Sequence, residues 1–287
     1  GVVLVAVLSL LALAAHPWTL RNTWSRRGIR LETGQRFVTA TATARTERTL
    51  ARVLHGLAPE DGDGRAVLAE WDLGHAIEWR ASRPTVATNF GLYVGEASFL
   101  APWRFFAETD VERARKILED RDVGLVLLDA RTAARRTTIA GALGYEGLAG
   151  PMWSSTMAAR LMGTGDGDAP GDLRMVRLAP DPRGGDVRVY EVVRGARLGA
   201  VATSMSLAVT VAGEGDATVT WRANARSSSG EPEALELRVP YSTDAEPTGA
   251  FGAARVESIQ LFVDSTRIDV EIPARAVEEG TRIEVGE

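Results

Sequence analysis

Residues 122–129, Asp-Val-Gly-Leu-Val-Leu-Leu-Asp, constrain the fold more than any other segment of this chain. The run between the two aspartates is almost continuously aliphatic, which predicts a strand that is buried on both faces. Residues 109–120 show a helical pattern, with Thr109 as the expected N-cap and acidic residues in the first turn. A short apolar run at residues 66–69 predicts a second buried strand. Strands and a helix in this order predict an α/β domain.

The character of the sequence changes after Gly195. Polar and apolar residues alternate in stretches such as 217–221 and 267–272, and clusters of Gly, Ser, Asp and Pro separate these stretches. Alternation at this spacing is typical of short antiparallel strands. We therefore expect a mixed α/β (α+β) soluble domain over residues 34–195, followed by a small antiparallel β domain over residues 196–287.

The first fifteen residues carry no charge. A membrane-spanning helix needs about 20 apolar residues, and the chain begins with Gly1 instead of methionine. We therefore expect residues 1–20 to be the end of a transmembrane helix in a longer protein, with Trp18 at the membrane surface. The core of a signal peptide and a buried helix remain alternatives for this segment.

Composition excludes several classes of function. With 33 Lys and Arg against 38 Asp and Glu, the net charge is −5, which argues against a nucleic-acid-binding protein. The chain has no cysteine, so disulfides, thiolate zinc sites and a cysteine nucleophile are excluded. The three histidines show no metal-binding spacing, and we expect no metal site in this chain.

Residues 70–75, Glu-Trp-Asp-Leu-Gly-His, resemble the Trp-Trp-Asp-Tyr-Gly motif of the catalytic subunit of oligosaccharyltransferase. Further blocks resemble that family in the family's own order. The later blocks include a Thr-Met-x-x-Arg-Leu segment, a Val-Tyr-Glu-x-Val segment and a Pro-Tyr-Ser-Thr signature of archaeal-type members. In chain order the blocks are residues 50–59, 156–161, Arg174, 187–196 and 239–243.

The resemblance implies a reaction and its partners. Members of the family transfer an oligosaccharide from a lipid-linked donor to the asparagine of an Asn-x-Ser/Thr sequon. They use acidic side chains and Mg or Mn, which suits oxygen ligands. Those acids lie on loops between membrane helices, so we expect no catalytic residue and no metal ligand in this chain, and no transferase activity from it alone. The expected partners are an acceptor polypeptide, the lipid-linked oligosaccharide and the membrane.

Two signals disagree on location. Four arginines follow the apolar segment and favour the cytoplasm by the positive-inside rule: Arg21, Arg26, Arg27 and Arg30. The resemblance instead implies an extracytoplasmic domain. We follow the resemblance, because large domains are translocated largely regardless of flanking charge.

The resemblance also implies which residues select the acceptor. A Ser or Thr hydroxyl has one hydrogen to donate and two lone pairs that accept. In the family a carboxylate takes the hydrogen and indole N–H groups serve the lone pairs, and Asp72 and Trp71 match those positions. Glu70 stands where the family has its first tryptophan, which removes an indole donor and adds an acid.

The remaining positions match the family's acceptor-binding elements less directly. Leu73 replaces the family's tyrosine, and Gly74 matches its glycine. The family's second acceptor-contacting element is expected between residues 129 and 157, where Ile139 is our candidate for its apolar contact. Met152, Met157 and Met162 are expected to be packing residues, at most one of them lining a groove.

Other interpretations remain open. Without the resemblance, Trp71 and Asp72 would be a core indole and a turn-capping carboxylate. The chain could also be a membrane-anchored extracytoplasmic binding module without enzymatic activity. A third possibility is a related lipid-linked sugar transferase with a non-protein acceptor, to which Glu70 and Leu73 would be adaptations.

Overall fold

The computed structural model describes residues 53, 55–56, 64–88, 95–165, 168, 170–180, 185–213, 217–244 and 254–285. The expected transmembrane segment over residues 1–20 lies outside these ranges. Across the ranges described, no helix combines the length and the apolar character needed to cross a membrane. Residues from Leu50 onward belong to one structural unit.

A four-stranded sheet forms the centre of the first part of this unit, with strand order β1-β2-β4-β3. β1 and β2 run parallel, whereas β4 is antiparallel to both β2 and β3. The strands predicted at residues 66–69 and 122–129 are confirmed as β1 and β2. The bounds are β1 Ala66–Leu68, β2 Val123–Leu128, β3 Leu173–Pro180 and β4 Asp186–Val192.

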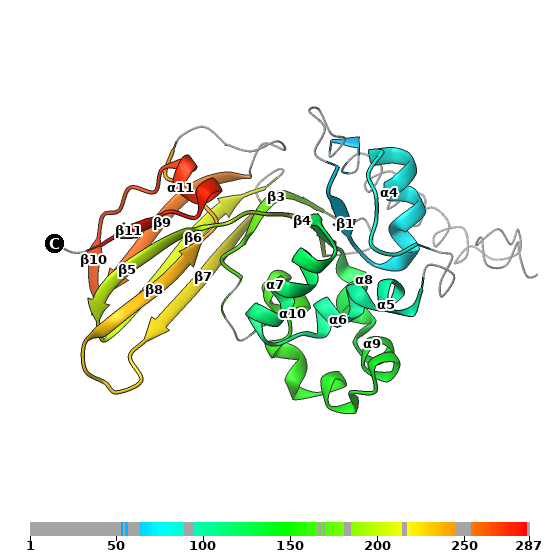
Figure 1. The fold of residues 1–287 in the computed structure, drawn as a ribbon, viewed down its shortest axis with the longest axis horizontal. Coiled ribbons are helices and arrows are strands. Elements are labelled where there is room, and N and C mark those ends of the chain that lie inside the picture. Colours follow the sequence, from blue (N-terminus) through cyan, green and yellow to red (C-terminus); the bar gives the residue numbers. More distant parts are fainter. Residues whose placement is uncertain are drawn as a thin grey trace, which may run out of the picture. The chain divides into compact units, whose positions relative to one another are not determined.

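Helices cover both faces of this sheet (Figure 1). On one face α4 (Gly74–Ala81) packs against Leu125 and Leu127 of β2. On the other face Val126 and Leu128 contact the cluster formed by α6 (Ala101–Ala107), α7 (Val111–Asp120) and α10 (Met157–Leu161). Every residue of β2 is therefore buried, which explains its unbroken apolar sequence.

The predicted helix at residues 109–120 is present, but its N-cap is not Thr109. The cap is Asp110, whose extended backbone leads into the helix and whose carboxylate accepts the Arg113 N–H at 2.8 Å. The Thr109 N–H instead donates to the carboxylate of Glu108 at 2.8 Å.

Short helices and 3-10 turns connect the remaining segments of the first part. The segment after β2 holds α8 and α9, and these two helices carry residues of the candidate site. The bounds are η1 Trp71–Leu73, α5 Glu96–Phe99, α8 Ala130–Ala134, α9 Arg136–Leu143, η3 Glu146–Ala149 and η4 Pro151–Ser155.

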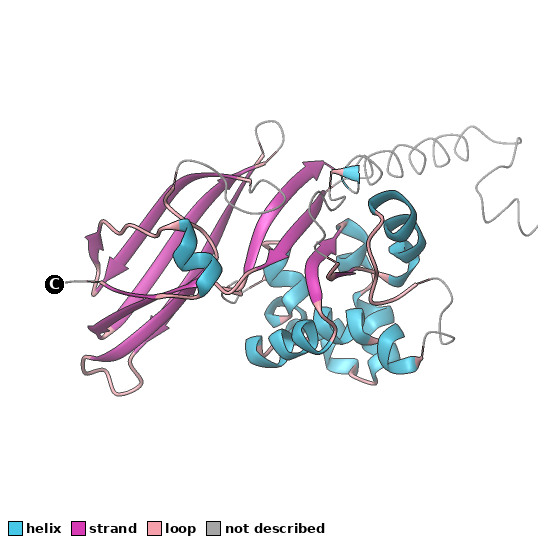
Figure 2. Ribbon diagram, turned by 45° about the horizontal axis from the view of Figure 1, so that its top comes forward, coloured by secondary structure: helices cyan, strands magenta, loops and turns pink. Residues whose placement is uncertain are grey.

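The second part holds two further sheets, with orders β10-β9-β6-β7 and β11-β5-β8, which share one hydrophobic core (Figure 2). Most pairings are antiparallel, but β11 runs parallel to β5, which the sequence did not predict. The bounds are β5 Ala196–Ala202, β6 Ser204–Ala212, β7 Thr218–Arg226, β8 Glu233–Val239, β9 Arg255–Val263, β10 Thr266–Ile268, α11 Ala274–Glu279 and β11 Arg282–Glu284.

The alternating stretches have different outcomes. Residues 218–221 belong to β7 as predicted, but the strand expected over residues 267–272 ends at Ile268. Beyond it, the Ile272 N–H donates to Thr243 Oγ1 at 2.9 Å, and the buried Ile272 side chain packs in the core. Pro273 follows and has no N–H to donate, so the chain turns into α11 instead of extending the sheet.

Tyr241 connects the two parts. Its hydroxyl accepts the backbone N–H of Met175, on β3, at 3.1 Å. Its ring lies edge-on to Trp221 of β7 with centroids 6.0 Å apart, and the Trp221 indole donates to the Pro170 carbonyl at 3.4 Å. A buried residue of the second part therefore completes the hydrogen bonding of the first sheet.

Candidate functional site

Charged side chains gather where β1 and β2 end. Glu70 and Asp72 follow β1, and Asp129 follows β2 directly. The two strands are parallel neighbours, so their carboxyl ends meet at one edge of the sheet. Arg131 and Arg135 reach this edge from the segment after β2, and we call these five residues the edge cluster.

Asp72 lies at the centre of the edge cluster. Its Oδ2 accepts hydrogen bonds from Arg135 Nη2 at 2.7 Å and from Arg131 Nη1 at 2.9 Å. The Asp72 side chain remains 20% exposed. The carboxylate is thus held in place by two cations, on a side chain that is partly exposed to solvent.

Asp129 fixes the orientation of Arg131. One Asp129 oxygen accepts the Arg131 backbone N–H at 2.9 Å, and the other accepts the Arg131 Nε–H at 2.7 Å. The Asp129 carboxylate is fully buried. A buried, doubly bonded carboxylate leaves the Arg131 guanidinium little freedom, and this positions it against Asp72.

Glu70 and Trp71 hold Arg135. Glu70 Oε2 accepts hydrogen bonds from Arg135 Nη1 at 3.2 Å and from the Trp103 indole at 2.8 Å. The guanidinium carbon of Arg135 lies 5.9 Å from the centroid of the Trp71 ring, which is a cation–π distance. Trp71 in turn packs on Phe99 of α5, with centroids 5.8 Å apart.

Burial and charge act in opposite directions on Glu70 and Arg135. Burial raises the pKa of Glu70, although the hydrogen bond from Trp103 and the charge of Arg135 oppose this shift. Burial alone lowers the pKa of Arg135, but its bonds to Asp72 and its attraction to both carboxylates outweigh burial and raise that pKa. Arg135 therefore stays a cation in this site.

The consecutive residues Glu70, Trp71 and Asp72 all contact Arg135, while Leu73 is buried in the core against α4. At Gly74 a Cβ atom would lie 2.3 Å from the Ala87 carbonyl oxygen. Only glycine fits this close approach, so Gly74 fixes the turn that carries Asp72.

Whereas the side chain of Asp72 is partly exposed, Ile139, the candidate for the apolar contact with the acceptor, is fully buried. Its side chain on α9 is 0% exposed and packs in the core between the helices, away from solvent. Its contact with an acceptor stays a prediction.

Sequence reasoning missed Arg131 and Arg135. The available signal was two arginines one helical turn apart, directly after a predicted buried strand that ends in aspartate. Side chains at positions i and i+4 lie on the same helix face, and the Arg135 N–H does bond to the Arg131 carbonyl at 2.9 Å.

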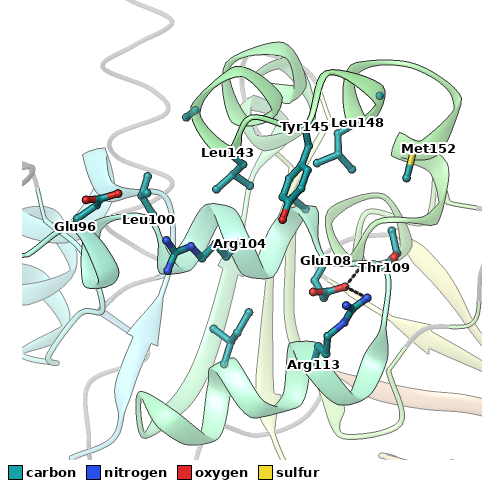
Figure 3. Close-up of a pocket in the computed structure, with 14 residues that line it drawn as sticks. Glu96, Leu100, Arg104, Glu108, Thr109, Arg113, Leu143, Tyr145, Leu148 and Met152 are labelled. Atoms are coloured by element: carbon teal, nitrogen blue, oxygen red, sulfur yellow. Dashed lines mark hydrogen bonds and ion pairs between the residues drawn. The ribbon is translucent and has the colours of Figure 1, made fainter.

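A groove of about 680 Å³ lies on the same helices (Figure 3). It runs between α5–α6 and the segment from α9 to η4. The exposed side chains of Tyr145 and Met152 line it together with Arg104, and the Glu108–Arg113 ion pair, 3.3 Å long, also lines it. Met157 is buried as expected of a packing residue, whereas Met152, also expected to pack, is exposed and lines the groove.

The donor set does not fit a bound divalent cation. Among the residues that the structure describes, no group of three His, Cys, Asp or Glu is arranged to hold a metal ion. Asp72 and Asp129 both bind the Arg131 guanidinium, which occupies the positions that a cation would need.

No protein-family model and no curated protein sequence matches this chain. Solved structures do match it. The archaeal oligosaccharyltransferase AglB from Archaeoglobus fulgidus, in complex with an inhibitory peptide and a dolichol-phosphate, has a TM-score of 0.67 at 14% identity over 93% of this chain. The fold is similar to that of archaeal oligosaccharyltransferases.

Two further structures of an Archaeoglobus fulgidus oligosaccharyltransferase agree. The complex with Zn and sulfate has a TM-score of 0.66 at 14% identity and covers 84% of this chain. The form tethered to an acceptor peptide with an NVT sequon has a TM-score of 0.63 at 15% identity over 77% of this chain. In the order given, the chain spans only 48%, 46% and 38% of the lengths of these three matched chains.

Proposed function

We propose that this chain is the acceptor-recognition part of an oligosaccharyltransferase, which transfers a lipid-linked oligosaccharide to the asparagine of Asn-x-Ser/Thr sequons. The observation that carries the proposal is the partly exposed Asp72 side chain beside Trp71, in a fold similar to that of archaeal oligosaccharyltransferases. One of the matched structures holds an acceptor peptide with an NVT sequon.

In this proposal Asp72 binds the acceptor's Ser or Thr side chain. The hydroxyl donates its hydrogen to the carboxylate, while the adjoining Trp71 ring forms one wall of the site. A site built for a hydroxyl rejects an analogue without one, because its own polar groups are then left unpaired.

The chemical step is assigned to residues outside this chain. Acidic side chains and Mg or Mn in the membrane part of the protein perform the transfer and hold the lipid-linked donor. The domain described here lies on the extracytoplasmic side of the membrane. The 287-residue chain alone should therefore transfer no oligosaccharide to an Asn-Val-Thr peptide, and measurable transfer by it would refute this assignment.

Peptide binding tests the recognition step. Two fluorescent peptides, one with Asn-Val-Thr and one with the near-isosteric Asn-Val-Val, are titrated with the full 287-residue chain in detergent. The loss of one hydrogen bond to a charged group corresponds to about 1.5–3 kcal/mol, so we expect the Thr peptide to bind about 10- to 100-fold more tightly.

Two variants make this test specific. Asp72→Ala should remove the preference for the Thr peptide. The matched control is Asp120→Asn, which changes an exposed carboxylate on α7 and should keep the preference. Equal affinity of the unmodified chain for both peptides would contradict the proposal.

A further inference from the structure

We infer that a cavity lined by residues of α7, β5 and β8 binds a phosphate group, as the free ion or as part of a small phosphate monoester. The cavity has a volume of about 370 Å³, and we call it the arginine cavity. Its lining residues all lie outside the edge cluster, and the inference does not depend on the proposed function.

Positive charge dominates the lining of the arginine cavity, in a chain whose net charge is −5. One of its three acids, Asp172, is already paired, because it accepts the Nε–H of Arg115 at 2.9 Å. The other two, Glu119 and Glu279, are exposed. Five arginines stand against these acids, so the lining carries an excess of cations. They are Arg65, Arg115, Arg194, Arg197 and Arg238.

Two of these arginines lie directly opposite each other. Arg197 on β5 and Arg238 on β8 are partners in the antiparallel register. Side chains at opposite positions have Cβ atoms about 4.5–5.5 Å apart, and like charges there destabilise a sheet. Neither arginine forms an ion pair with a carboxylate of a described residue. A bound anion would offset the repulsion between the two guanidinium groups.

Hydrogen bonds to backbone carbonyls hold both guanidinium groups in place without neutralising them. Arg197 Nε donates to the Gly280 carbonyl at 3.1 Å. Arg238 Nη1 donates to the Arg194 carbonyl at 3.4 Å. A guanidinium has five N–H groups, so each of these two arginines keeps four for a ligand. Both residues are half-buried, and the attraction between charges is stronger there than in bulk water.

Two glycines with left-handed backbones shape the place of a third arginine. Gly195, with φ +71°, lies in the turn from β4 into β5, and Gly280, with φ +72°, ends α11. A Cβ at Gly280 would lie only 3.2 Å from the Cβ of Arg194. The Arg194 side chain is exposed and makes no hydrogen bond or ion pair with a described residue. Its guanidinium is therefore available to a ligand in the cavity.

These donors fit a phosphate group. The planar guanidinium fork matches two phosphate oxygens at once. A phosphate monoester carries about 1.5–2 negative charges at pH 7, which balances the excess of cations in the lining. The volume of about 370 Å³ lies in the range of small-molecule sites, so an organic group has room beside the phosphate.

Titration calorimetry tests the site. The full 287-residue chain in detergent is titrated with glycerol 3-phosphate, inorganic phosphate and glycerol at constant ionic strength and about pH 7.5, where a phosphate monoester is mostly a dianion. We expect saturable binding of glycerol 3-phosphate and none of glycerol. Tighter binding of the ester than of inorganic phosphate identifies an ester as the ligand, and the reverse order identifies the free ion.

Substitutions place the binding in the arginine cavity. Arg197→Gln and Arg238→Gln should each weaken glycerol 3-phosphate binding by about tenfold or more, because a charge-assisted contact is lost. The matched control is Arg222→Gln, which removes the same charge from an exposed position of β7 outside the lining and should leave the affinity unchanged.

Arg194→Gln carries the test if the variants on β5 and β8 do not fold, because it changes an exposed side chain that makes no hydrogen bond to a described residue. It should also weaken the binding of glycerol 3-phosphate.

Three results would overturn the inference. The first is the absence of saturable binding of both phosphate ligands. The second is an unchanged affinity in every folded variant of Arg194, Arg197 and Arg238, because phosphate then binds elsewhere. The third is an equal loss in Arg222→Gln, because the binding then depends only on total charge. None of these results bears on the preference for the Thr peptide, so the proposed function is tested separately.

Discussion

The two parts of the unit bury different kinds of side chain. Among the described residues, every buried charged side chain belongs to the first part, and the core of the second part is aliphatic and aromatic. The buried charged residues are Glu70, Arg83, Asp129, Asp172, Arg174, Arg188 and Glu191. Burying a charge is costly unless it is paired, and ion pairs hold several of these side chains, such as Asp129 with Arg131 and Arg174 with Glu191.

The difference shows where a site can be built. Apolar packing in the second part stabilises a shape but offers no group that selects a ligand. In the first part, paired charges fix the positions of one another, and the edge cluster is one place where such paired charges reach solvent. Substitutions in the two parts should therefore have different effects on stability.

The largest expected effect is at Arg174 on β3. It bonds to Glu191 on β4 at 2.6 Å, and both side chains are buried. Arg174→Ala should lower the free energy of unfolding by about 3–5 kcal/mol, because it leaves a buried carboxylate without its partner. Urea unfolding followed by circular dichroism measures the change.

The control comes from the second part. Arg255 pairs with Glu257 at 3.3 Å on the exposed surface of β9, and Arg255→Ala should cost about 0–1 kcal/mol. The double variant Arg174→Met/Glu191→Leu should recover much of the loss, because it removes both charges. Equal effects of Arg174→Ala and Arg255→Ala would remove the distinction between the two parts.

A smaller effect is expected at Tyr241, which links the parts. Tyr241→Phe keeps the ring but leaves the buried N–H of Met175 without its acceptor, so it should cost about 1–3 kcal/mol of unfolding free energy. Tyr145→Phe, at an exposed ring in the groove, should cost almost nothing. Unfolding of the two parts in separate transitions would show that this link does not couple them.

The smallest effect is on the pH dependence of stability. The pKa of Glu70 is raised by burial, so the native state binds more protons than the unfolded state from about pH 4.5 up to that raised value. The contribution of Glu70 is therefore largest in acid and is lost as the pH rises through this window. The unfolding free energy of the unmodified chain, relative to Glu70→Gln, should fall over this range.

A residue of the second part should show the opposite sign. Hydrogen bonds from Thr203 and Ser204 lower the pKa of Asp264, so its contribution is lost as the pH falls. The unfolding free energy relative to Asp264→Asn should therefore rise with pH in the acidic range. If the unfolding free energy relative to Glu70→Gln and that relative to Asp264→Asn changed with pH in the same direction, the assigned pKa shifts would be contradicted.

The sequence predicts strands best where a single physical pattern dominates. The run at residues 122–129 is apolar throughout because both faces of β2 are covered, and no turn or cap competes with that pattern. The alternation at residues 267–272 misleads, because the hydrogen bonds of Ile272 to Thr243 and the proline that follows decide the backbone there. Thr243 lies 29 residues away, so a local pattern does not contain that contact.

The candidate site is predictable only in part for the same reason. The turn with Glu70, Trp71 and Asp72 is contiguous, so a motif can identify it. Arg131 and Arg135 join it from about sixty residues away, through the parallel pairing of β1 and β2. The exposure of Asp72 depends on those partners, which no local pattern specifies.

The one-turn spacing of Arg131 and Arg135 limits how this segment can change over evolution. A single-residue insertion or deletion between them would rotate one guanidinium by about 100° around the helix axis and away from Asp72. Length changes should therefore accumulate beyond Arg135 and be rare between residues 131 and 135. In sequences with Glu at the position of Glu70, we expect that interval to be constant in length even where the rest of α9 varies.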